Sequence, residues 1–186
     1  MKCKKFFAAA AACLMVAGFA ACGNEPTPIN PDEKVFQIGI CQLVEHPALD
    51  EATRGFQEFL TEKLGDRVQF SVQNAQGEQT NCTTIVNQFV AAKVDLIMAN
   101  ATNAVKAARE ATSDIPIVGT SVTDYVSSGL VASNEAPGAN VTGASDMNPV
   151  NVQVDLMKTL CPTVKTVGIV INSGEENSAI QAEEAK

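Results

Sequence analysis

Short apolar runs alternate with apolar residues at helical spacing from residue 35 onward. The runs predict strands at residues 35–43, 68–74, 95–100, 115–121 and 141–145. The helical stripes between them predict helices at residues 47–64, 84–92 and 103–111. Strands that alternate with helices at this spacing predict an α/β fold, a doubly wound parallel sheet with helices on both faces. Residues 35–145 are long enough to form one such lobe.

The pattern begins again after residue 145. Asn148 and Pro149 are typical of a helix start, and apolar residues at helical spacing follow as far as Leu160. Residues 164–171 predict another strand. Two capping-box patterns follow, each opened by a serine, Ser173 and Ser178. One strand and parts of two helices cannot bury a core. We therefore expect residues 146–186 to be a hinge crossover and the incomplete beginning of a second α/β lobe, and we expect these 186 residues alone to bind a ligand weakly.

The first 34 residues have a different character. Lys2, Lys4 and Lys5 precede an apolar run at residues 6–19, which is too short to span a bilayer and is typical of a secretory signal peptide, residues 1–21. A buried N-terminal helix is the alternative, but the run lacks a polar face. Residues 19–23 resemble a bacterial lipobox, which implies lipidation of Cys22. Residues 22–34 then predict a flexible tether. The expected location is extracytoplasmic, on the membrane through this lipid.

Acidic residues outnumber basic ones, 21 to 13, and loss of the leader removes lysines only. An acidic chain without a basic cluster argues against nucleic acid as a partner. Of six cysteines, two leave with the leader and Cys22 is assigned to lipid. The other three allow one disulfide, but their wide spacing favours small buried thiols: Cys41, Cys82 and Cys161.

Catalytic patterns are missing from the sequence. It has no glycine-rich phosphate loop, no cluster with metal-ligand spacing and no paired-carboxylate motif. His46 precedes Pro47, which favours a loop or helix-cap role. Cys41 and His46 could suggest a nucleophile and its base. Cys41 lies within an apolar strand, however, where thiols are usually inert. We therefore predict no enzyme, no cofactor and no metal.

Several blocks of sequence carry a family resemblance. Residues 38–50 (IGICQLVEHPALD) resemble the start of the ABC-transporter substrate-binding family that includes tryptophan- and tyrosine-binding lipoproteins. More blocks follow in the family's order, at residues 74–77, 95–97, 120–124, 137–143, 145–146 and 174–178. The resemblance implies the type I periplasmic-binding fold, in which two lobes enclose the ligand. It also implies an amino-acid ligand, often aromatic, with a membrane permease and its ATPase as partners.

Candidate ligand-binding residues lie at the predicted strand ends and within these blocks, because a parallel sheet binds ligands at the carboxyl ends of its strands. A strand that gives way to a helix N-terminus at Thr102 and Asn103 favours a ligand carboxylate. Glu45 and Asp124 are the carboxylates placed to meet its ammonium group, and Tyr125 could stack on an aromatic ring. The full candidate set is Gln42, Glu45, Asn100, Thr102, Asn103, Thr120, Asp124, Tyr125, Ser145, Asp146, Asn172, Asn177 and Ser178.

Simpler roles compete for some of these positions. Thr102, Ser173 and Ser178 could be ordinary helix caps. Asp124 could be a turn residue that bonds its own backbone, and Tyr125 could be a surface-loop aromatic. The predicted function is an ABC-importer receptor for an amino acid. The alternative is a ligand-sensing receptor domain of the same fold that feeds a signalling partner.

Overall fold

The computed structural model describes residues 34–186. The expected signal peptide, most of the tether and the lipidation site Cys22 lie outside the described residues. The described elements, in chain order, are β1 (Phe36–Gln42), α1 (Pro47–Leu64), the short 3-10 helix η1 (Gly65–Arg67), β2 (Val68–Asn74), α2 (Gln79–Ala92), β3 (Leu96–Asn100), α3 (Thr102–Ala111), β4 (Ile117–Val122), β5 (Val141–Ser145), α4 (Val150–Leu160) and α5 (Glu176–Glu184).

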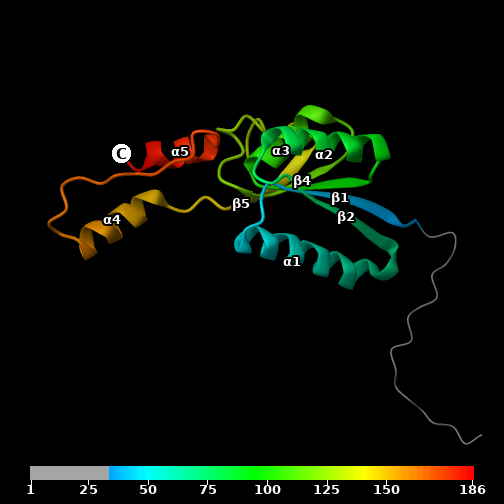
Figure 1. Ribbon diagram of the computed structural model, residues 1–186, viewed down its shortest axis with the longest axis horizontal. Helices are drawn as coiled ribbons and strands as arrows, with labels where there is room; N and C mark the ends of the chain where they lie inside the picture. Colours follow the sequence, from blue (N-terminus) through cyan, green and yellow to red (C-terminus); the bar gives the residue numbers. More distant parts are fainter. Residues whose placement is uncertain (1–33) are drawn as a thin grey trace, which may run out of the picture.

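Five parallel strands form one sheet in the order β2-β1-β3-β4-β5. Helix α1 covers one face and helices α2 and α3 cover the other, while α4 and α5 lie beyond the end of the sheet (Figure 1). The predicted α/β lobe with helices on both faces is thus confirmed. Because β2 lies on one side of β1 and the chain then crosses through α2 to β3 on the other side, the sheet has its topological switch point between β1 and β3.

Each face of the sheet has its own apolar core. The face toward α2 and α3 holds the larger core, which includes Ile97, Val105 and Phe89. The face toward α1 holds a smaller one around Ile40 and Met98. Side chains alternate between the two faces along each strand, so the buried run of β1 supplies both cores.

Glycines allow close packing at two points of the sheet. A Cβ on Gly39 in β1 would lie 2.6 Å from ring atoms of Phe89, so the bare glycine is what lets the α2 ring rest on the sheet. Strands β4 and β5 each contribute a glycine beside Tyr125. A Cβ on Gly119 in β4 would lie 2.5 Å from the Tyr125 hydroxyl, and a Cβ on Gly143 in β5 would lie 2.1 Å from it. Both positions therefore fix where an aromatic ring lies.

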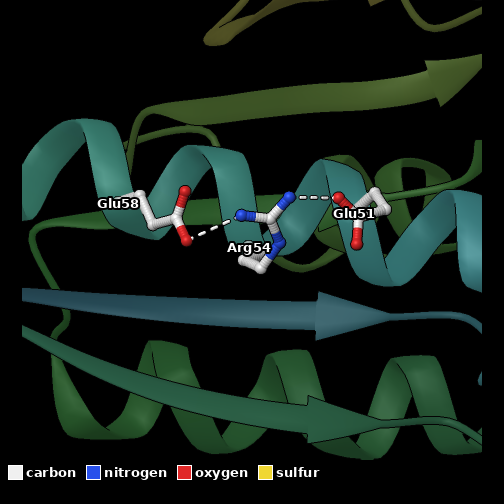
Figure 2. Close-up of polar contacts among 3 residues, drawn as sticks. All are labelled: Glu51, Arg54 and Glu58. Carbon is white, nitrogen blue, oxygen red and sulfur yellow. Dashed lines mark hydrogen bonds and ion pairs between the residues drawn. The ribbon is translucent and has the colours of Figure 1, made fainter.

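Helix α1 begins as its sequence predicts. His46 is the N-cap, and its Nδ1 accepts a hydrogen bond from the backbone N–H of Ala48, which assigns the single histidine to capping. On the exposed side of α1, the Arg54 guanidinium lies between the carboxylates of Glu51 and Glu58 (Figure 2). These ion pairs hold the pKa of Glu51 below its usual range, mainly through the hydrogen bond from Arg54. They are solvent-exposed pairs along one helix and contribute little to stability.

The predicted strand at residues 164–171 is wrong for this structure. The segment forms no strand, and Val170 is 99% exposed. A strand needs a neighbour to take its backbone hydrogen bonds, and no strand of the sheet in residues 34–186 lies beside it. Helix α4 and helix α5 flank the segment, with a groove of about 690 Å³ between them.

Helix starts also differ from the predictions. Helix α2 begins at Gln79 rather than residue 84, because its polar first turn carries no apolar signal. Helix α4 begins after Pro149, one residue later than expected, and helix α5 begins after Glu175. Neither serine capping box forms: Glu175 is the N-cap without a side-chain bond, and Ser178 lies inside the first turn. Among residues 34–186, none of the helices is long and apolar enough to cross a membrane.

Candidate functional site

A buried polar network lies at the switch point of the sheet. Gln42 ends β1 and Asn100 ends β3, and the two residues are register partners. The hydroxyl of Thr53, on α1, joins them. It donates to Gln42 Oε1 at 2.7 Å and accepts from Asn100 Nδ2 at 3.0 Å. The sequence placed Gln42 and Asn100 at the site, and the structure brings them together through a residue that the sequence analysis missed.

Further bonds hold the two amides in fixed orientations. Gln42 Nε2 donates to Asp50 Oδ1 at 2.6 Å and to the carbonyl of Val44 at 2.9 Å. Asn100 Nδ2 also donates to the carbonyl of Leu49 at 2.8 Å. Asn100 is 0% exposed, yet its Oδ1 has no hydrogen-bond partner. A buried acceptor without a donor is uncommon and marks a place where a bound group could supply one.

The backbone is strained around this network. Ala101, the N-cap of α3, has φ 90° and ψ 155°, a region that L-residues rarely occupy. Ser121 near the end of β4 and Gln76 after β2 also have positive φ, at 55° and 56°. The Ala101 N–H bonds to the carbonyl of Thr120, the register partner of Asn100. Such strain concentrates at ligand-binding edges. The strained residue Ala101 leads directly into the N-terminus of α3, where Thr102 is buried and Asn103 is partly exposed.

Asp124 is held by its own turn. Its carboxylate accepts from the backbone N–H groups of Val126 and Ser127, at 2.9 and 3.0 Å, and from the Ser127 hydroxyl at 2.8 Å. The hydrogen bonds from Ser127 are the main reason that the pKa of Asp124 lies below its usual range. This arrangement favours the simpler role, a turn acid that bonds its own backbone, and the ammonium role stays a prediction.

Tyr125 packs inside the fold rather than on a surface loop. It is 7% exposed, and its hydroxyl donates to the carbonyl of Ala144 at 3.3 Å. Burial and the nearby charge of Asp146 raise the pKa of Tyr125 to about 12. The alternative role of a surface-loop aromatic is therefore wrong, because the ring fills the space left by the glycines of β4 and β5. Stacking on a ligand stays a prediction.

The segment after β5 is tied to the lobe by polar contacts. Lys106 Nζ on α3 lies 2.6 Å from Glu176 Oε2 at the start of α5. Gln181 Nε2, farther along α5, donates to Thr123 Oγ1 at 3.3 Å. Beside the ion pair lies a cleft of about 490 Å³, lined by Gln79, Asn103, Lys106, Glu110, Ser173, Gly174 and Glu176. The cleft therefore lies between the start of α2, the length of α3 from Asn103 to Glu110, and the start of α5 with the residues just before it.

The remaining predicted site residues are dispersed. Glu45 is exposed after β1. Ser145 donates to the carbonyl of Thr123, which fixes the chain where it leaves the sheet toward Asp146. Asn172 bonds Glu175 and the backbone of Gly174, so it stabilises a turn. Asn177 is partly exposed in α5, and Ser178 lines the groove toward α4.

Of the candidate residues predicted from the sequence, only Asn103 lines the cleft beside the Lys106–Glu176 ion pair. The sequence analysis missed the charged pair that spans the cleft, Lys106 and Glu176. One signal was available, since Lys106 follows Asn103 by about one helical turn and so projects from the same end of α3. Among residues 34–186, no group of histidine, cysteine or acidic side chains is arranged to hold a metal ion.

Comparisons with known proteins agree on one family. The model of a family described as "ABC transporter substrate binding protein" matches residues 37–186. A tyrosine-binding protein from Clostridioides difficile (strain R20291) is 46% identical over 154 residues, which cover 81% of this chain and 45% of that protein. The chain therefore spans about half the length of this curated relative.

Solved structures show the same similarity. The structure of an ABC domain in complex with L-Trp, from Streptococcus pneumonia, is 41% identical with a TM-score of 0.77, covering 81% of this chain and 52% of that one. The ligand-free, open structure of a substrate binding protein with adhesive properties, from Clostridium difficile, is 42% identical with a TM-score of 0.66 and the same coverage.

Proposed function

Because this chain belongs to the ABC transporter substrate binding protein family, we propose that it captures an aromatic amino acid, tyrosine or tryptophan, for an ABC importer. The family resemblance expected from the sequence is confirmed. The relatives are solute-binding proteins rather than enzymes, which also confirms the expectation of a non-enzymatic chain. The observation that carries the proposal is the cleft between the lobe, along α3, and the start of α5.

The charges of the cleft suit the two ends of a free amino acid. A ligand carboxylate needs donors, which Lys106 and the free N–H groups at the start of α3 supply. A ligand ammonium needs acceptors, and the carboxylates of Glu110 and Glu176 line the same cleft. In the structure Lys106 and Glu176 satisfy each other. An amino-acid zwitterion that binds between Lys106 and Glu176 breaks this ion pair and forms two new ones. Its carboxylate pairs with Lys106, and its ammonium group pairs with Glu176.

The preference for an aromatic side chain has a different basis. The lining residues of the cleft are polar or charged apart from Gly174, so they do not select a ring. The support is the tyrosine-binding relative and the L-Trp complex.

Calorimetry of the full-length protein against the twenty amino acids tests the proposal. We expect tryptophan and tyrosine to bind most tightly. In Lys106→Met, we expect the affinity to fall roughly tenfold or more, because a hydrogen bond to a charged group is worth about 1.5–3 kcal/mol. Lys158→Met is the matched control, since Lys158 lies on α4, outside the lining of the cleft, and forms an ion pair with Asp155 in its own helix. Binding of a sugar or a metal ion in place of any amino acid would contradict the proposed function.

We further propose that the protein works outside the cytoplasm, held to the membrane by a lipid on Cys22, and delivers its ligand to a permease and its ATPase. The support is the sequence of the leader and the small residues that precede Cys22. The strongly acidic chain suits a protein body that stays off an anionic membrane surface.

Labelling of cells with a fatty-acid probe tests the anchor. We expect the wild-type protein to carry the label and to sediment with membranes, because acyl chains hold a protein at the bilayer. Cys22→Ala should lose the label and appear in the soluble fraction, whereas Cys161→Ala should keep it. Equal labelling of the wild type and Cys22→Ala would refute the assignment.

A further inference from the structure

Two of the three free cysteines in residues 34–186 face each other in the core. Cys41 is the residue before Gln42 at the end of β1, and Cys82 lies in the first turns of α2. Both are fully buried and belong to the same apolar cluster, and each thiol lies close enough to the other to shift its pKa. Cys161, the third, is exposed at the end of α4.

The packing of α2 on β1 explains this juxtaposition. Alternate residues of β1 point to the same face of the sheet, so Gly39 and Cys41 both face α2. The ring of Phe89 rests on Gly39, and the helix runs back along the strand from there. Its first turns therefore reach the end of the strand, where Cys82 meets Cys41. Both partners belong to rigid elements, which hold the two sulfur atoms as neighbours.

We propose that Cys41 and Cys82 form a disulfide when the protein meets an oxidant of the disulfide class. The Cys82 thiolate attacks one sulfur of the oxidant, whose S–S bond breaks and releases one thiol. The Cys41 thiolate then attacks Cys82 Sγ and releases the second thiol of the oxidant. The two cysteines lose two electrons, which reduce the oxidant, and two protons pass to the two thiols that leave.

The order of attack follows from the surroundings of each thiol. Cys82 lies near the N-terminus of α2, and the neighbouring Cys41 thiol holds the pKa of the Cys82 thiol below its usual range. The Cys82 thiol, together with burial, raises the pKa of Cys41. Helix ends open locally more readily than central strands, so an oxidant reaches Cys82 first. The disulfide would then join the strand end that carries Gln42 to α2, beside the polar network.

Peptide mapping of the full chain tests the proposal. The purified protein is incubated with oxidised glutathione, denatured, alkylated and digested with trypsin. Cleavage after Lys34, Arg54, Arg67 and Lys93 places the two cysteines on separate peptides, residues 35–54 and 68–93. We expect these peptides to be linked in the oxidised sample and separate after reduction. The link closes a loop of roughly 40 residues, so the oxidised protein should unfold roughly 10 °C above the reduced one.

Two variants separate the pair from the third cysteine. Cys161→Ala should keep both the linked peptides and the rise in unfolding temperature, and Cys82→Ala should lose both. Alkylation of both Cys41 and Cys82 after the oxidant treatment would overturn the proposal. So would a link from Cys161 to either of them.

Discussion

Gly39→Ala is expected to lower the free energy of unfolding by about 2–3 kcal/mol, because the added Cβ would lie 2.6 Å from the Phe89 ring. Gly39 is in β1, which has a hydrogen-bonded neighbour on each side, so the strand cannot retreat from α2. The ring is itself 2% exposed and enclosed by the larger core. Urea denaturation of the variant and the wild type measures the difference as a shift of the midpoint.

Two controls identify the cause of this loss. Gly55→Ala on α1 adds a Cβ that meets nothing within 4 Å, so it should stabilise the helix by about 0.5–1 kcal/mol. Phe89→Leu provides a smaller partner for the methyl group introduced by Gly39→Ala. The double variant should therefore be more stable than the sum of the two single losses predicts. Strict additivity would show that the contact between residues 39 and 89 is not the cause.

Thr53→Val is expected to cost about 2–3 kcal/mol of stability although valine and threonine have nearly the same shape. The change removes the hydroxyl that donates to Gln42 Oε1 and accepts from Asn100 Nδ2. Gln42 Oε1 is then buried without a donor, and a buried unsatisfied polar group costs about 1–3 kcal/mol. Asn100 keeps its bond to Leu49 and loses less. Chemical denaturation at pH 7 is the measurement.

Thr53→Ser is the matched control for the hydroxyl. Serine keeps both hydrogen bonds and loses only a methyl group, so its cost should stay near roughly 1 kcal/mol. Ligand affinity should follow the same order, with the valine variant weaker than the serine variant, because Asn100 ends β3 and leads through Ala101 into α3, which lines the cleft. A valine variant as stable as the serine variant would show that the amides do not depend on Thr53.

The alternation of strands and helices was determined by the sequence. Each strand of the lobe is a short run of apolar residues, and each helix has an apolar stripe, so local periodicity was enough to predict the parallel sheet. Strong local signals also placed the start of α1, where His46 and Pro47 cap and open the helix. Gln42 and Asn100 were predictable as neighbours because strand ends meet at one edge of a parallel sheet; their role as ligand contacts stays a prediction.

Only the tertiary structure decided which side chains meet. Thr53 lies on a helix stripe like any other residue, and only the packing of α1 on the sheet brings its hydroxyl between two strand ends. Cys41 and Cys82 become neighbours through the course of α2 along β1, which no sequence spacing records. Residues 164–171 have the local pattern of a strand but no neighbouring strand in the structure. Periodicity specifies what a segment can form, whereas hydrogen-bond partners and packing over long sequence separations decide what it does form.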